Sequence, residues 1–466
     1  MRVNRLFASL FVLSLTAIAG CSGSPSSNPP PAGSTPASLT MIDAPPAGVT
    51  VISFEVNVTG AALNPGGVDL LAGKGPIQIE VKRLEVETGF LGTTNVAPGT
   101  YSSLNLTFAN PQLTFKNDST ASIAGCASGQ VCKITPTAAA LTATINFTPG
   151  LVISNNSPIG LQVDVKLSNL LSNSLGVDFS LNGAVTVAQS QAKPEGELED
   201  IEDTFGTVQN KGSNTFDLKT SRGNTLTGIQ VDGNTKFEGF DAATTPCTAN
   251  PQNFTCVANG QMVEVDLKMQ PSGALLARKV EQENEDTNEE EVEGIVFSVN
   301  ASTSSFQMVA LENLSTLPSS VLGNPMNVTV LPAARFEVEG SGRSSNPQFS
   351  GIGSMTAGQN VQVRRQTGDG STLQPVTTDR VRLRLSRFTG KVNSKLDANT
   401  FVVDNLPSIF GSGAQITVNT TSQTRFEGVA NVSGLNPPPN ADTVSLRGLL
   451  FNGTPITLAA KKVRKR

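Results

Sequence analysis

The stretch Phe205-Gly206-Thr207-Val208 places a glycine inside an otherwise strand-like segment, and it recurs twice further along the chain. The later copies are Glu293-Gly294-Ile295-Val296 and Thr389-Gly390-Lys391-Val392. Glycine weakens a regular strand, so its presence there indicates a sharp bend or the close approach of another backbone. The stretch therefore predicts three copies of a small, strongly curved β unit.

Three further landmarks follow each glycine in the same order. A strand headed by phenylalanine comes first, at Phe216, Phe306 and Phe401. A basic residue before Phe-Glu comes next, in Lys236-Phe237-Glu238, Arg335-Phe336-Glu337 and Arg425-Phe426-Glu427. A closing hairpin ends on a basic residue before valine, in Arg278-Lys279-Val280, Asp379-Arg380-Val381 and Lys461-Lys462-Val463. The period of about 90 residues exceeds that of solenoids and predicts tandem domains at 205–281, 292–386 and 387–466.

This repeated unit resembles the small β-barrel called domain of unknown function 5666. The resemblance covers most of residues 205–466, with an enlarged second copy at 300–327. It implies three OB-like barrels of five or six short strands, a fold that often binds oligonucleotides or sugars. The chain has no Trp and one Tyr, so an aromatic platform for stacking bases is thin, and we expect the phenylalanines to be core.

The region 37–189 shows apolar residues at every second position in several segments. They include Ile52, Phe54, Val56, Val58; Ile77, Ile79, Val81; Leu104, Leu106, Phe108; Leu141, Ala143, Ile145, Phe147; and Leu161, Val163, Val165, Leu167. This period is typical of strands with one buried face. Because no crossover helices separate the segments, we predict an antiparallel β-sandwich, and an all-β fold for the whole chain.

Two motifs in this region, Leu39-Thr40-Met41-Ile42-Asp43-Ala44-Pro45 and Val96-Ala97-Pro98-Gly99-Thr100-Tyr101, resemble marks of the bacterial lipoprotein domain of unknown function 4382. The resemblance implies a prealbumin-like β-sandwich over the first 150 or so mature residues. Pro98-Gly99 predicts a tight turn, and the hydroxyl of Tyr101 can reach back to the backbone beside it. We interpret Asp43 as a turn residue rather than a catalytic acid.

The N-terminus has the pattern of a secretory signal peptide, with Arg2 and Arg5 before an apolar run from Leu6 to Ile18. This run is shorter than the roughly 18 to 20 residues of a membrane span. Its end, Ile18-Ala19-Gly20-Cys21, resembles the lipobox of bacterial lipoproteins. The resemblance implies a signal peptide at 1–20, lipid on Cys21, and, through Ser22, an outer-membrane location facing the periplasm or the cell surface. Residues 21–36 are predicted to be a disordered tether.

The other four cysteines form two close pairs, Cys126 with Cys132 and Cys247 with Cys256. Local disulfides are the simplest pairing in an oxidising compartment. A four-thiolate metal site is the alternative, and it requires loops from two domains to meet. We expect the disulfides and neither a metal nor a cofactor.

Several activities are excluded or disfavoured. The chain has no histidine, which excludes Ser-His-Asp and Cys-His catalysis. The segment from Gly66 to Gly75 has the wrong glycine spacing for a phosphate loop, and no Ser or Thr follows Lys74. A net charge of −5 offers no broad basic surface, so no nucleic-acid partner is expected. No residue is singled out as catalytic.

Two acidic runs interrupt the domains, within 190–204 and from Glu281 to Glu293. Calcium binding would need oxygen ligands spaced to converge, and neither run has such spacing. We predict self-repelling, solvated linkers at 190–204 and 282–291. The basic terminus Lys461–Arg466 is interpreted in the same way, as a solvated chain end.

The sequence thus favours a lipid-anchored envelope lipoprotein that is not an enzyme and acts as a binding, adhesion or scaffold array. Its expected partners are the membrane, through Cys21, and an envelope protein or a glycan; no oligomeric state follows from the sequence. The alternative is a carboxylate-dependent hydrolase, of carbohydrate-active or peptidase type. A deep cleft with two carboxylates about 5 to 9.5 Å apart would favour the hydrolase.

Overall fold

A computed structural model describes residues 35–44, 49–190, 196–240, 247–249, 251–283, 290–314, 321–339, 346–365 and 376–466. The described chain consists almost entirely of strands, which confirms the predicted all-β fold. Residues 33–466 form one compact unit. Among the described residues, no helix has the length and apolar character needed to span a membrane. Cys21, with the predicted signal peptide and most of the tether, lies outside the described residues.

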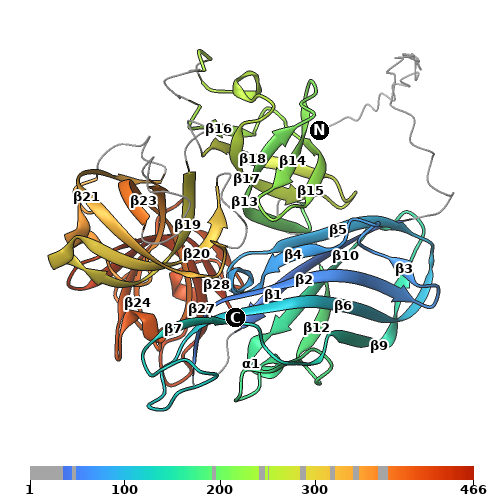
Figure 1. The fold of residues 1–466 in the computed structure, drawn as a ribbon. Coiled ribbons are helices and arrows are strands. Elements are labelled where there is room, and N and C mark those ends of the chain that lie inside the picture. Colours follow the sequence, from blue (N-terminus) through green and yellow to red (C-terminus); the bar gives the residue numbers. More distant parts are fainter. Residues whose placement is uncertain are drawn as a thin grey trace, which may run out of the picture. The chain divides into compact units, whose positions relative to one another are not determined.

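The N-terminal domain is a β-sandwich of two main sheets (Figure 1). One sheet has the order β12-β10-β1-β5, with bounds Val185–Ser190, Ile159–Lys166, Thr35–Ala44 and Gly89–Val96. The other has the order β3-β2-β6-β7, with bounds Val68–Asp69, Thr50–Asn64, Gly99–Lys116 and Val131–Ile134. In addition, β4 (Ile77–Glu80) pairs with β2, β9 (Thr142–Ile153) pairs with β6, and β8 (Ala138–Ala140) pairs with β11 (Val177–Asp178).

The alternating residues of β2, β6 and β10 form the sandwich core, as their period predicts. Phe54, Leu104 and Val163 are fully buried. Two pairs depart from the antiparallel expectation, because β1 with β10 and β8 with β11 run parallel. A period of two reports which face of a strand is buried but carries no information on strand direction. The hydroxyl of Tyr101 donates to the carbonyl of Ala97 at 2.9 Å, which is the backbone contact expected beside the Pro-Gly turn.

Three barrels follow, and each closes along the same path of first, second, third, fifth and fourth strand. Barrel 1 contains β13 (Glu199–Gln209), β14 (Thr215–Thr220), β15 (Thr225–Gln230), β17 (Met262–Met269) and β18 (Leu275–Gln282). Its third and fifth strands, β15 and β18, pair in parallel, and β17 returns to β13. A short extra strand, β16 (Lys236–Glu238), lies parallel to β18. This closed five-stranded barrel is the OB-like architecture that the resemblance implies.

Barrels 2 and 3 share a strand. Barrel 2 uses β19 (Glu290–Asn300), β20 (Ser305–Asn313), β21 (Pro325–Val338), β22 (Asn360–Arg365) and the first half of β23 (Val376–Lys395). Barrel 3 uses the second half of β23 with β24 (Thr400–Asp404), β25 (Ile416–Asn419), β27 (Thr443–Phe451) and β28 (Ile456–Lys465), and β26 (Arg425–Glu427) is added to β28. The strand β23 pairs with β22 up to Arg384 and with β27 from Leu385. The predicted boundary at 386 therefore falls inside a continuous strand.

Short helical turns connect the strands. They are α1 (Leu167–Leu170), η1 (Val81–Glu85), η2 (Phe254–Cys256), η3 (Ala301–Thr303), η5 (Ile352–Ser354), η6 (Ser408–Phe410) and η7 (Val432–Gly434).

The sulfur atoms of Cys126 and Cys132 are 2.07 Å apart and those of Cys247 and Cys256 are 1.93 Å apart. Both pairs are therefore disulfides in the structure, with the pairing that their spacing predicts.

The repeated glycines lie where the first strand of each barrel is crowded by other parts of the same barrel. A Cβ atom built on Gly206 would lie 2.5 Å from the Lys219 carbonyl oxygen, and one on Gly294 would lie 2.0 Å from the Val309 carbonyl oxygen. A Cβ atom on Gly390 would lie 2.9 Å from the Leu406 side chain. The glycines are therefore required by close approach, which is what their position inside a strand predicts.

Candidate functional site

Charged side chains from the sandwich and all three barrels meet in the interior and form what we call the ionic hub. The acidic runs supply much of it. Their buried members are Glu197, Glu199, Asp200, Glu202, Asp203, Glu281, Glu283, Glu291 and Glu293. The prediction of solvated linkers is wrong for these residues, and 191–195 and 284–289 lie outside the described residues. The carboxylates still repel one another, but arginines and lysines remote in sequence lie beside them and offset this repulsion.

Asp203 is the hub residue that connects barrel 1 to barrel 3 and to the sandwich. Its carboxylate is held by Arg387 and Arg447, both of barrel 3, and its carbonyl oxygen accepts from Arg83 of η1 at 2.9 Å. Burial alone would raise the pKa of Asp203. The charges of Arg447, Arg387 and Arg83 outweigh burial and hold this pKa well below its usual value.

Arg384 plays the corresponding role between barrels 1 and 2. Its guanidinium, 2% exposed, contacts four carboxylates: Glu264, Glu283 (2.8 Å), Glu293 (3.3 Å) and Glu339 (3.4 Å). Lys279 adds a second cation, with Nζ 3.1 Å from Glu264 and 2.9 Å from Glu281. Burial nevertheless raises the pKa of Glu264 well above its usual value and also raises that of Glu283, because neighbouring carboxylates oppose the effect of the nearby basic groups on these pKa values.

The basic C-terminus also enters the hub, which corrects its interpretation as a solvated chain end. Lys462 on β28 is 1% exposed and lies 3.1 Å from Glu202 and 3.2 Å from Glu427. The last residue, Arg466, donates to the hydroxyl of Ser445 at 2.8 Å and to the carbonyl oxygen of Glu85 in the sandwich. The end of the chain is therefore a structural contact.

Two carboxylate triads in the hub have oxygen atoms within 4.8 Å of one another, Asp203 with Glu264 and Asp266, and Glu264 with Glu281 and Glu339. Three converging carboxylates are a donor set that a hard cation such as Ca²⁺ accepts. The residue common to both triads, Glu264, already binds Lys279 and Arg384. Lys279 and Arg384 therefore supply the positive charge that a bound cation would otherwise provide, and we assign both triads to the ionic hub.

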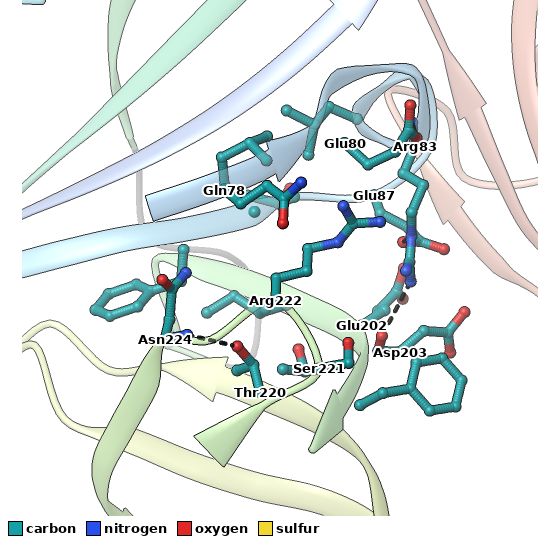
Figure 2. Close-up of a pocket in the computed structure, with 18 of the residues that line it drawn as sticks. Gln78, Glu80, Arg83, Glu87, Glu202, Asp203, Thr220, Ser221, Arg222 and Asn224 are labelled. Atoms are coloured by element: carbon teal, nitrogen blue, oxygen red, sulfur yellow. Dashed lines mark hydrogen bonds and ion pairs between the residues drawn. The ribbon is translucent and has the colours of Figure 1, made fainter. Parts of the chain in front are cut away.

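A small charged pocket lies between the sandwich and barrel 1, beside Glu312 of barrel 2 (Figure 2). Its volume is about 110 Å³. In Figure 2 the side chain of Arg222 extends from the β14–β15 turn toward Gln78 and Glu87. Arg222 contacts Glu55 and Glu312, each at 3.1 Å, and donates to the carbonyl oxygen of Leu311 at 2.8 Å.

The carboxylates that line the charged pocket are engaged by arginines, by Lys462 or by backbone amides. Arg83 binds Glu87 at 3.0 Å and also binds Glu312. Glu80 accepts from the amide of Phe54 at 2.8 Å, while burial raises the pKa of Glu80. The ion pairs around the charged pocket connect the sandwich to the barrels. A pocket of this size has no room for a saccharide.

A second, larger space, the open cleft, has a volume of about 610 Å³. The sandwich contributes the β3–β4 loop with Lys74 and strand β5 with Phe90, and barrel 1 contributes β15, the turn between β14 and β15 and the turn between β17 and β18. Within the described residues, no aspartate or glutamate lines the cleft. Its polar groups include Lys74, Asn224, Thr225 and Thr227, and its apolar groups include Phe90 and Leu275.

Of the cysteines predicted as site residues, the four that the structure describes line neither space. Cys126 and Cys132 staple the segment between β6 and β7, and Cys247 and Cys256 staple a loop of barrel 1. From the sequence, the segment around Lys74 was considered as a phosphate loop and excluded, and no other role was predicted for it. The remaining cleft residues carry no motif, and the one available signal was that glycines flank Lys74 and follow Arg222, as expected for exposed turns.

A family model described as "Domain of unknown function (DUF5666)" matches residues 205–281 and 389–464. These are barrels 1 and 3, together less than half of the chain, and barrel 2 follows the same strand path without being matched. No curated protein matches the chain. The solved structure described as "drosophila Unr CSD456" is 9% identical, with 57% of this chain and 97% of that chain covered and a TM-score of 0.14, which is too low to support any argument about the fold.

Proposed function

We propose that the protein is a lipid-anchored, non-enzymatic lipoprotein of the outer membrane, in which the compact β unit is a scaffold and the open cleft binds a saccharide. The observation that carries the proposal is the open cleft itself. A volume of about 610 Å³ falls in the usual range for small-ligand sites. Its lining contains both hydrogen-bonding and apolar side chains. A sugar needs both kinds, because its hydroxyls form hydrogen bonds and the face of its ring packs against apolar groups.

The chemistry of the linings favours binding over hydrolysis. Glycoside hydrolysis needs two carboxylates beside the substrate, one of them free to give or take a proton. The described lining of the open cleft contains none, whereas the carboxylates of the charged pocket are engaged by basic side chains or amides in a space of about 110 Å³.

The position of the cleft on barrel 1 also supports the proposal. Its barrel wall includes β15, which is the third strand, the turn between the second and third strands, and the turn between the fourth and fifth strands. OB-like barrels use the second and third strands and this same turn to bind oligosaccharides or oligonucleotides. Gly273 of the turn packs so closely against the sandwich that a Cβ atom would lie 2.4 Å from Thr93. The two walls are therefore close together beside the cleft.

The lipid anchor in the proposal is supported by the sequence alone. The segment before Cys21 has signal-peptide and lipobox character, and a proline- and serine-rich segment separates it from β1. A lipid on Cys21 would keep the protein attached to the membrane.

A saccharide array probed with the full-length protein in detergent tests the proposed function. Thr227→Val removes a hydroxyl from the cleft, and Thr417→Val is the matched control on the third strand of barrel 3. We expect binding that Thr227→Val weakens and Thr417→Val leaves unchanged. Absence of binding to any saccharide would overturn the proposal, and release of shortened saccharides during incubation would favour the hydrolase.

A further inference from the structure

We infer that the open cleft selects a saccharide that carries one carboxylate, which Lys74 binds. The inference rests on the proposed saccharide-binding function and specifies the ligand. Lys74 is the one charged side chain among the described residues that line the cleft. A ligand that fills the cleft therefore meets a single positive charge among neutral groups.

The ammonium group of Lys74 is not neutralised by the protein. It is exposed, and its nearest polar contact is the Thr227 hydroxyl across the cleft, at 3.5 Å. This distance is at the outer limit of a hydrogen bond. No described carboxylate lies within 4.0 Å of Lys74 Nζ, whereas the hub cations Lys279 and Arg222 each contact two acids. Lys74 thus offers a charge that an anionic ligand can use.

The backbone around the cleft favours a carboxylate over a phosphate. Phosphate groups present three strong acceptor oxygens and nearly two charges, and proteins commonly meet them with several free amides. Here the amides of Gly223 and Gly273 donate to the carbonyl oxygens of Thr220 and Gln270, at 3.0 and 2.8 Å. The amide of Gly228 donates to Asp217 at 2.7 Å. A single lysine, acting as a point charge, is matched by the single charge of a carboxylate.

The neutral lining can receive the rest of the sugar. Asn224 and Thr225 follow the β14–β15 turn on the barrel wall and present an amide and a hydroxyl. On the opposite wall, Phe90 packs partly against the core of barrel 1 and offers an apolar surface to the cleft. A uronic acid combines these features, since its carboxylate is attached to a ring with hydroxyls and an apolar face.

The test compares three probes by calorimetric titration of the full-length protein in detergent. They are a uronic-acid disaccharide, its neutral hexose counterpart and a hexose phosphate. Lys74→Met removes the charge and keeps most of the apolar stem, and Lys236→Met is the control at an exposed lysine of β16 that does not line the cleft. We expect the uronic-acid probe to bind about tenfold more tightly than the neutral one, as a charge-assisted hydrogen bond allows.

Lys74→Met should remove this preference and leave neutral binding unchanged, while Lys236→Met should preserve it. Equal affinity of the wild-type protein for the acidic and neutral probes would overturn the inference and leave the proposed function standing. Tighter binding of the phosphate probe would overturn the assignment of a carboxylate. Failure of all three probes, together with an empty saccharide array, would instead overturn the proposed function.

Discussion

At the scale of single residues, a glycine in each barrel sets how closely the first strand can approach its neighbour. Gly294 is the tightest case, because the first atom of any side chain there would lie 2.0 Å from the Val309 carbonyl oxygen. We expect Gly294→Ala to lower the free energy of unfolding by about 2 to 3 kcal/mol, the range of overpacking. Urea denaturation would measure the loss. Gly353→Ala is the control, because nothing lies within 4 Å of a Cβ atom there, and an equal loss in both variants would contradict the argument.

Arg384 contacts four of the hub carboxylates. Its removal leaves Glu264, Glu283 and Glu293 buried with less compensating charge. We expect Arg384→Leu to destabilise the protein by about 3 to 5 kcal/mol at pH 7, as for other broken buried ion pairs. The loss should shrink at pH 5, because the stranded carboxylates can take up protons.

The matched control for Arg384→Leu is Arg335→Leu in the same barrel, where the side chain is 58% exposed. The ion pair that Arg335 forms with Glu337, at 3.9 Å, should contribute at most about 1 kcal/mol, because the Arg335 side chain lies largely in solvent. If both leucine variants unfold at the same urea concentration, the hub does not carry the stability assigned to it.

At the scale of elements, the hub should give stability an unusual dependence on pH. The pKa values of Glu264 and Glu283 are raised in the folded state, so the native protein binds these protons more tightly than the unfolded chain. Their stabilising contribution is complete below the ordinary value of 4.5 and is lost as pH rises through the folded values. Asp203 and Glu202 have lowered pKa values, so their contribution is present above the unfolded values and is lost as pH falls through the folded ones.

Stability should therefore be greatest at mildly acidic pH and decline toward neutral pH. In Glu264→Gln one of the groups responsible for the decline is gone, so the slope of unfolding free energy against pH should be shallower in the interval above the ordinary value of 4.5. Glu238→Gln, at an exposed position on β16, should leave the slope unchanged. A wild-type slope that rises over this interval would show that the lowered carboxylates dominate instead.

The strands themselves could be predicted from the sequence, because a strand with one buried face has an apolar residue at every second position. The barrel closures could be predicted from the resemblance and from glycines such as Gly206. The acidic strand β13 could not, because Asp203 finds its partners Arg387 and Arg447 more than 180 residues away. The open cleft was missed for a similar reason, since Lys74 and Thr227 become neighbours only when barrel 1 lies against the sandwich.

At the scale of the whole molecule, the hub joins parts that the sequence suggests are separate. Ion pairs that link barrels 1, 2 and 3 are buried, and residues 33–466 form one compact unit. We expect one cooperative calorimetric transition for the intact chain, with agreement between calorimetric and van't Hoff enthalpies. Well-separated transitions would show that the barrels are independently stable, and expression of 205–281, 292–385 and 387–466 as fragments would then identify which of them fold.

The anchor makes a separate prediction for the whole molecule. Cys21→Ala removes the acylated thiol, and stable membrane attachment needs more than one acyl chain, so the variant should leave the membrane fraction. Cell fractionation with a high-salt wash measures this, and Cys126→Ala controls for the general effect of losing a cysteine. A Cys21→Ala protein that still sediments with washed membranes would contradict the lipobox interpretation.

The strand shared by barrels 2 and 3 has a consequence for how this chain can have arisen and how it can change. Genetic recombination between repeats normally preserves each module when the breakpoint falls in a connecting loop. Here a breakpoint near residue 386 would sever β23, which closes barrel 2 and opens barrel 3. Barrels 2 and 3 should therefore be gained, lost or transplanted together, as a single heritable pair.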